Sequence, residues 1–185
     1  VDNFSTGSKD NIKKFFSNSN FKFLQHDIKE SLDLNVNQIW HLACPASPKY
    51  YLKNPINTSI VNFIGTYNIL ELAKKYNAKV LFTSSSEIYG DPIKTPQDEK
   101  YKGSFDTTSI RSCYSEGKRI AESLCYDYLR TYNMDIKVAR IFNTYGPNMK
   151  ANDGRVISNF ISSALRNENL DIFGDGTQTR SFCYI

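Results

Sequence analysis

The chain has 185 residues, which suits one domain with a sizeable core, and 40% of them are apolar. Its net charge of +4 is only mildly basic, and no run of lysines and arginines is long enough to indicate a nucleic-acid surface. No apolar run reaches the roughly 20 residues of a membrane span, and no signal-peptide pattern is present.

Apolar stretches of strand length alternate along the chain with stretches of helical period. The expected strands are 21–28, 38–44, 79–86, 135–146 and 170–174. The expected helices are 57–76, 113–132 and 155–167. This alternation predicts parallel strands joined by crossover helices, and therefore a doubly wound parallel α/β sheet.

The four cysteines indicate neither a metal site nor a disulfide framework. Cys44, Cys113, Cys125 and Cys183 are far apart, and only two histidines accompany them. We expect free thiols in a reducing compartment, and therefore a cytoplasmic protein without a bound metal.

The two ends of the sequence suggest a piece of a longer protein. The first residue is Val1, and the last five residues, SFCYI, lie within an apolar run. We therefore expect a chain cut at both ends, and an N-terminal anchor in a missing segment stays open.

Ligands of such sheets bind at the carboxyl ends of the strands. The residues that follow the expected strands are Asp27, Cys44–Ser47, Ser84–Glu87 and Asn143–Pro147. A dinucleotide-binding unit would also carry a Gly-rich turn before its second strand, and the chain has none. Asp2 stands where an acidic residue would bind the adenosine ribose, although, taken alone, a turn-forming Asp is the better explanation. The sequence fits a chain that begins just after the Gly-rich turn.

Tyr114 and Lys118 lie four residues apart in an expected helix, so they share one face. A nearby ammonium, together with a positively charged nicotinamide, would favour the phenolate form of the tyrosine. Lowering its pKa by about three units requires about 4 kcal/mol. The phenolate could then take a proton from a hydroxyl whose carbon loses hydride. The alternative to a catalytic role is that Tyr114 and Lys118 are an exposed pair of side chains, four residues apart on a helix surface.

The segment LFTSSSEIYG strengthens the catalytic interpretation. Ser84, Ser85 and Ser86 end an apolar strand, where consecutive hydroxyls gain nothing from core packing, and Glu87 follows them. A serine-rich turn explains one or two of these residues. It does not explain hydroxyls, a carboxylate and a Tyr-x-x-x-Lys pair in this order.

The motifs TSSSEIYGDP, RSCYSEGKRIAE and ARIFNTYGP resemble the extended short-chain dehydrogenase/reductase family of nucleotide-sugar enzymes. The segments HLACPASP, DNFSTGSKDN, DGRVISNF and GDGTQTRSF are similar to the UDP-glucuronate decarboxylase subfamily within it. The resemblance covers essentially the whole chain. It implies one NAD-binding domain over residues 1–185, without its first strand and Gly-rich loop, and a substrate-binding lobe that begins at about residue 147.

The resemblance also implies roles for individual residues. Tyr114 would be the catalytic base and acid, with Lys118 lowering its pKa and holding the nicotinamide ribose. Ser85 would orient the sugar C4 oxygen, and Ser86 and Glu87 would act around the carboxylate and C5. NAD would be bound by Asp2, Asn3, Thr6, Gly7, Asp27, Ile28, Leu42, Thr83, Thr144, Tyr114 and Lys118. The UDP-sugar substrate would be bound by Asn143, Arg155, Asn159 and Arg180, the last of these through charge-assisted hydrogen bonds to phosphate.

The activity implied is decarboxylation of UDP-glucuronate to UDP-xylose through a 4-keto intermediate, with no net redox change. A sibling nucleotide-sugar 4,6-dehydratase or 4-epimerase stays open, as does a non-catalytic remnant. A dehydratase would be expected to show Asp-Glu where Ser86 and Glu87 stand. The resemblance further implies a homodimer formed through the helix at 113–132.

Overall fold

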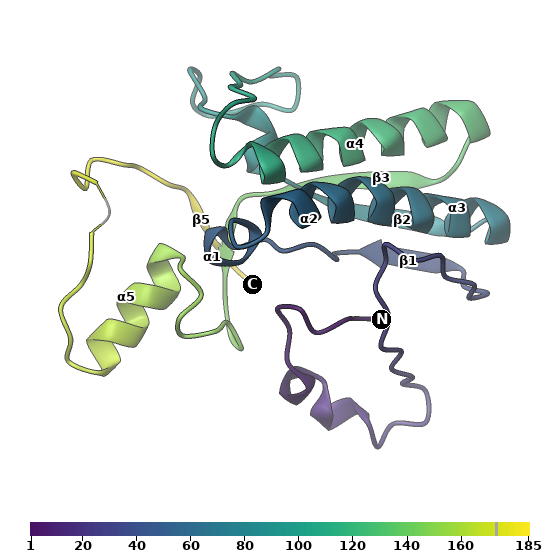
Figure 1. Ribbon diagram of the computed structural model, residues 1–185, viewed down its shortest axis with the longest axis horizontal. Coiled ribbons are helices and arrows are strands. Elements are labelled where there is room, and N and C mark those ends of the chain that lie inside the picture. The colour runs from purple at the N-terminus through teal and green to yellow at the C-terminus, as the bar shows by residue number, and fades with distance from the viewer. Residues whose placement is uncertain (173) are drawn as a thin grey trace.

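The computed structural model describes residues 1–172 and 174–185, and it is built around a parallel sheet of three strands (Figure 1). These strands are β1 (Gln38–His41), β2 (Lys79–Ser85) and β3 (Ile136–Ile141), and β2 lies between the other two. Val80 of β2 pairs with Ile39 on one side and with Ile136 on the other. Each connection between neighbouring strands contains a helix, as parallel pairing requires. The predicted parallel α/β architecture is confirmed.

Two helical segments pack on the same face of this sheet and against each other (Figure 1). The first consists of α2 (Pro55–Ile60), a π-helical turn η3 (Val61–Gly65) and α3 (Thr66–Tyr76), and the second is α4 (Ser112–Tyr132). The core between helices and sheet is formed by Leu70, Ala73, Ala78, Val80, Phe82, Ala121, Cys125, Tyr128 and Ile136. Burial of these apolar side chains holds α4 over β2, and so it positions the start of α4 at the carboxyl end of that strand.

Local signals in the sequence explain where these helices begin and end. Asn54 caps α2, since its side-chain oxygen accepts a hydrogen bond of 3.1 Å from the backbone N–H of Asn57, and Pro55 occupies the first turn. Asn77 and Asn133 follow α3 and α4 in the left-handed region, at φ of 51° and 52°. Asparagine tolerates this conformation better than most residues, so both positions end their helices.

The remaining elements are short or lie toward the C-terminus. They are η1 (Lys9–Asn11), η2 (Lys13–Phe15), α1 (Pro48–Tyr51), η4 (Ser86–Tyr89), β4 (Asn143–Tyr145), α5 (Val156–Leu165) and β5 (Phe182–Tyr184). Strands β4 and β5 pair in parallel as a separate small sheet. In the part of the chain that is described, no helix is both long and apolar enough to cross a membrane.

Three of the strand predictions require correction. The strand expected at 21–28 is wrong, because only one bridge, between Asp2 and Gln25, forms there. The stretch 135–146 is two strands, because the chain leaves the first sheet at Phe142. The strand expected at 170–174 includes residue 173, which lies outside the described residues, and its other residues form no strand. Strand β5 was not predicted.

Candidate active site

Tyr114 and Lys118 both lie buried in the first two turns of α4, with 6% and 3% of their surfaces exposed. The Lys118 ammonium lies 6.0 Å from the centre of the Tyr114 ring and 5.0 Å from that of Phe82. It donates a hydrogen bond of 2.8 Å to the backbone carbonyl of Thr83 on β2. Because a buried charge is costly unless it is hydrogen-bonded, this carbonyl anchors the ammonium next to the phenol.

Close packing of α4 against η3 sets the position of this pair. Gly117 lies between Tyr114 and Lys118, and a Cβ atom there would lie only 3.0 Å from the Asn62 side chain. Asn62 is itself buried, and its amide donates a hydrogen bond of 2.9 Å to the carbonyl of Thr58. The glycine therefore lets the helix that carries the pair approach its neighbour directly.

The serines at the end of β2 point in different directions and have different partners. Ser84 is buried and donates a hydrogen bond of 2.7 Å to Glu122 of α4, so it belongs to the packing between helix and sheet. Ser85 caps η4, since its hydroxyl accepts a hydrogen bond of 3.2 Å from the backbone N–H of Glu87. Ser86 and Glu87 are half-buried. Of the three serine side chains, that of Ser85 lowers the pKa of the Tyr114 phenol.

Burial dominates the electrostatics of Tyr114. Loss of hydration raises the pKa of its phenol well above the ordinary value, and the Cys44 thiol nearby raises it further. The Ser85 side chain acts in the opposite direction and lowers the pKa. The chain by itself therefore favours the phenol over the phenolate, and the predicted phenolate requires additional positive charge at this site.

Two residues without a predicted role, Arg111 and Tyr51, complete this cluster. Arg111 immediately precedes α4; its guanidinium forms an ion pair with the Glu87 carboxylate, and its Nε donates a hydrogen bond of 2.8 Å to the Tyr51 hydroxyl. Tyr51 stacks on Tyr114 with ring centres 4.9 Å apart and planes within 8°. Arg111 stands three residues before Tyr114 in the RSCYSEGK motif, and that position was the only signal for it.

The N-terminal residues assigned to the cofactor lie together, although the strand expected there is absent. The Asn3 amide donates a hydrogen bond of 3.2 Å to the Asp27 carboxylate. Asp2 accepts one of 2.6 Å from the backbone N–H of Phe4. Together with Gly7, Asp2 lines a cavity of about 200 Å³ at this edge of the molecule. Thr6 is half-buried in the same turn.

Of the other residues assigned to the cofactor, Leu42 directly follows β1 and Thr83 lies toward the end of β2, whereas Ile28 belongs to no strand and Thr144 lies within β4. Ile28 is buried, Leu42 is exposed directly after β1, and Thr144 is half-buried on β4. The Thr83 hydroxyl donates a hydrogen bond of 3.0 Å to the His41 carbonyl, which ties β2 to the end of β1.

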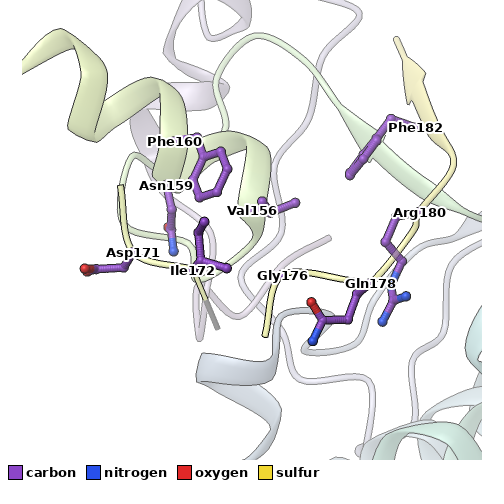
Figure 2. A pocket seen from close by; sticks show the side chains of 9 residues that line it. All are labelled: Val156, Asn159, Phe160, Asp171, Ile172, Gly176, Gln178, Arg180 and Phe182. Carbon is purple, nitrogen blue, oxygen red and sulfur yellow. The ribbon is translucent and has the colours of Figure 1, made fainter. Parts of the chain in front are cut away.

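A second cavity, of about 460 Å³, lies between α5 and the segment that leads to β5 (Figure 2). Its lining residues are Val156, Asn159, Phe160, Asp171, Ile172, Gly176, Gln178, Arg180 and Phe182. Figure 2 shows Asn159 on α5 and Arg180 on the opposite segment. Two of the four residues predicted to bind substrate thus share one cavity.

The other two predicted substrate residues have protein partners. Arg155 does not line this cavity, and its guanidinium pairs with the neighbouring Asp153 carboxylate. Asn143, on β4, donates a hydrogen bond of 3.1 Å to the carbonyl of Ser181. Their roles toward a substrate stay predictions.

Comparison with known proteins gives the family. The family model described as "NAD dependent epimerase/dehydratase family" matches residues 5–185. UDP-glucuronic acid decarboxylase 6 of Arabidopsis thaliana is 55% identical over all 185 residues, and UDP-glucuronic acid decarboxylase 1 of Xenopus tropicalis is 51% identical. The chain spans 54% and 44% of these two relatives, or about half their length.

Solved structures of the same kind share the fold. A UDP-N-acetylglucosamine 4-epimerase from Methanobrevibacter ruminantium matches 98% of this chain and 59% of its own, with a TM-score of 0.85 and 28% identity. A UDP-glucuronic acid 4-epimerase from Bacillus cereus, in complex with UDP-glucuronic acid and NAD, matches 95% of this chain and 55% of its own, with a TM-score of 0.80 and 28% identity. The chain belongs to the NAD-dependent epimerase/dehydratase family, and the predicted resemblance is confirmed.

Proposed function

We propose that the chain belongs to an NAD-dependent UDP-glucuronate decarboxylase, a carbon–carbon lyase that forms UDP-xylose. The observation that carries the proposal is the 51–55% identity over the whole chain to proteins of that name in a plant and a vertebrate. The arrangement of the site agrees with it, since a phenol, an ammonium, a hydroxyl and a carboxylate converge at the carboxyl end of β2.

The residues present fit a dinucleotide. A Cβ atom at Gly7 would lie 3.4 Å from the Asp2 carboxylate. Because glycine has no such atom, the space beside this carboxylate, which can accept hydrogen bonds from ribose hydroxyls, stays open. Asp2, Asn3, Gly7 and Asp27 would hold the adenosine end, and Lys118 would hold the nicotinamide ribose. The chemistry that NAD supplies when bound is removal of a hydride from sugar C4 and its return at the end of the turnover.

In this proposal Tyr114 holds or moves the proton of the C4 hydroxyl. Tyr114 accepts that proton while C4 is oxidised, and it returns a proton to the C4 oxygen when the ketone is reduced. The Ser85 hydroxyl orients the same oxygen. Because burial and neighbouring groups such as the Cys44 thiol raise the pKa of Tyr114, the Lys118 ammonium and the cofactor's positive charge must both favour the phenolate for the first step to proceed.

The carbon–carbon bond then breaks in the substrate. Oxidation of C4 places a ketone β to the C6 carboxylate, so the electrons of the C5–C6 bond move onto the ketone oxygen as CO₂ leaves. A proton must next be added at C5. Glu87 and Ser86 lie next to Ser85 in the chain and are the groups we assign to this region of the sugar, where they exclude water and direct that proton.

The substrate's diphosphate would bind in the cavity between α5 and the segment before β5. Arg180 offers a guanidinium for charge-assisted hydrogen bonds, and Asn159 offers an amide on the other side of the cavity (Figure 2).

Proton NMR of UDP-glucuronate, incubated with NAD⁺ and the protein expressed from its complete reading frame, tests this function. Formation of UDP-xylose is expected, and Glu87→Gln should slow it strongly. Unchanged UDP-glucuronate with turnover of a neutral UDP- or dTDP-hexose would reassign the protein to a sibling epimerase or dehydratase. No turnover of any nucleotide sugar and no bound cofactor would favour a non-catalytic remnant.

We also propose a homodimer formed through the two helical segments. Apolar and aromatic side chains remain 42–44% exposed on them, at Ile60, Phe63 and Tyr67 of the first segment and Ile120 of α4. A symmetric contact would cover this surface. Light scattering of the complete protein tests it. A cytoplasmic location stays a prediction, and the presence of four free cysteines supports it.

A further inference from the structure

A chain of contacts links the carboxylate of Glu87 to the ring of Tyr114. The Arg111 guanidinium pairs with Glu87, its Nε binds the Tyr51 hydroxyl at 2.8 Å, and Tyr51 stacks on Tyr114. Arg111 is also joined to Tyr114 through the backbone, since its carbonyl accepts the Tyr114 N–H at 3.0 Å. Arg111 therefore contacts both sides of the site.

We propose that Arg111 and Tyr51 are positioning residues, which hold the Glu87 carboxylate and the Tyr114 ring in one fixed relative geometry. This inference rests on the proposed function, in which Tyr114 handles the C4 proton and Glu87 acts near C5. Those two carbons are neighbours in the sugar ring, so the two side chains must keep a constant separation during the turnover.

The stability of the fold does not by itself account for the ion pair between Arg111 and Glu87. The two side chains are 44% and 35% exposed, and ion pairs with such access to water contribute little to folding. Their geometry is nevertheless specific, because Arg111 uses its Nε and a terminal nitrogen for two different partners. A planar guanidinium can fix two groups relative to each other, whereas a lysine ammonium cannot.

Tyr51 is suited to orienting the Tyr114 ring. It is only 1% exposed, and its carbonyl accepts a hydrogen bond of 3.0 Å from the hydroxyl of the fully buried Thr58. Burial raises the pKa of Tyr51, so its side chain stays a neutral phenol that can accept the Arg111 hydrogen bond. A rigid, nearly parallel ring at 4.9 Å restricts rotation of the Tyr114 side chain.

A double-mutant cycle on the protein from its complete reading frame tests the inference. Arg111→Ala should lower kcat for UDP-glucuronate by about 100-fold with little change in KM, since misplacement of catalytic groups by about 1 Å costs that much. The same substitution in a Glu87→Gln background should cost far less, because Arg111 would no longer have a carboxylate to position. Arg111→Lys should recover only part of the loss.

Two further variants separate positioning from folding. Tyr51→Phe keeps the stacked ring but removes the acceptor for Arg111, and we expect a smaller fall in kcat that disappears in the Arg111→Ala background. Arg130→Ala removes an arginine within α4, whose exposed pair with Asp127 lies near the far end of the helix. It should leave kcat unchanged.

The outcomes discriminate between the two proposals. Wild-type kcat in Arg111→Ala, or losses that multiply in the double variant, would overturn the positioning role and leave the decarboxylase function intact. If the wild type turns over a different nucleotide sugar, the proposed function fails, and the same cycle with that sugar still decides the role of Arg111. A protein that turns over no nucleotide sugar would overturn both.

Discussion

His41 makes the stability of the fold sensitive to mild acid. It ends β1, is 5% exposed, and its Nε2 lies 3.0 Å from the Thr66 hydroxyl. Burial is the main cause that lowers the pKa of its imidazole from the ordinary value of 6.5 to about 3, and the nearby Lys118 ammonium contributes to the same shift. The folded chain therefore holds His41 neutral, near the buried Lys118 ammonium.

The size of this effect follows from the two pKa values. The unfolded chain binds the His41 proton more tightly than the folded chain, so the stabilisation is complete above pH 6.5 and is lost as the pH falls toward 3. At 1.36 kcal/mol per unit, the free energy of unfolding should fall by about 1.3 kcal/mol between pH 7 and pH 5.5, and by about 2.5 kcal/mol between pH 7 and pH 4.5.

Urea unfolding followed by circular dichroism at these three pH values measures the effect. His41→Gln keeps a partner for Thr66 and removes the titrating group, so the stability of this variant should depend less on pH by about the same 2.5 kcal/mol. His26→Gln is the matched control, because the chain has two histidines and His26 is only half-buried. If His41→Gln loses as much stability as the wild type in acid, the reasoning is wrong.

Three other changes probe chemistry and packing. Tyr114→Phe should lower kcat by about 10² to 10⁴-fold and leave cofactor binding intact, as measured by the fluorescence of bound NADH. Near-normal turnover would assign proton transfer to another group. Glu122→Gln should reduce the free energy of unfolding, measured in urea, by about 3 kcal/mol, because it leaves the Arg140 guanidinium, which is 21% exposed, without its carboxylate partner. A loss under about 1 kcal/mol would mean that water takes the place of the carboxylate. Gly90→Ala should reduce the free energy of unfolding by about 3 kcal/mol in the same assay, since the φ of Gly90 is 64° and a Cβ atom would lie 1.8 Å from the Ser104 carbonyl oxygen. Wild-type stability of this variant would contradict the observed turn.

The sheet and the long helices could be predicted because their signals are local. Apolar patterning identifies 79–86 and 113–132 nearly to the residue, since β2 and α4 each contribute apolar side chains to the same buried core. The segment 21–28 has the same apolar character, but only Gln25 pairs, as a single bridge with Asp2. Strand formation depends on a neighbour, which composition does not reveal.

The proximity of Tyr114 and Lys118 on α4 could be predicted because their spacing of four residues fixes a shared helix face, and their catalytic role stays a prediction. Arg111 and Tyr51 could not be predicted in the same way, because they are 60 residues apart and meet only when α1 packs against the start of α4. The state of the Tyr114 phenol was equally hidden. A neighbouring lysine favours phenolate, yet burial, which only the fold determines, acts more strongly in the opposite direction.

The short helix α1 contacts both parts of the proposed site, the start of α4 and the loop that leads into α5. At its start, the buried Ser47 hydroxyl bonds to the carbonyl of Asp153, and the Lys49 ammonium donates a hydrogen bond of 3.2 Å to the carbonyl of Asn152. At its end, Tyr51 stacks on Tyr114. The loop that α1 holds leads into α5, which lines the cavity proposed for the diphosphate. A single turn of helix thus contacts both α4 and the loop before α5, so a displacement of α1 would disturb the proposed proton transfer and the proposed diphosphate site together.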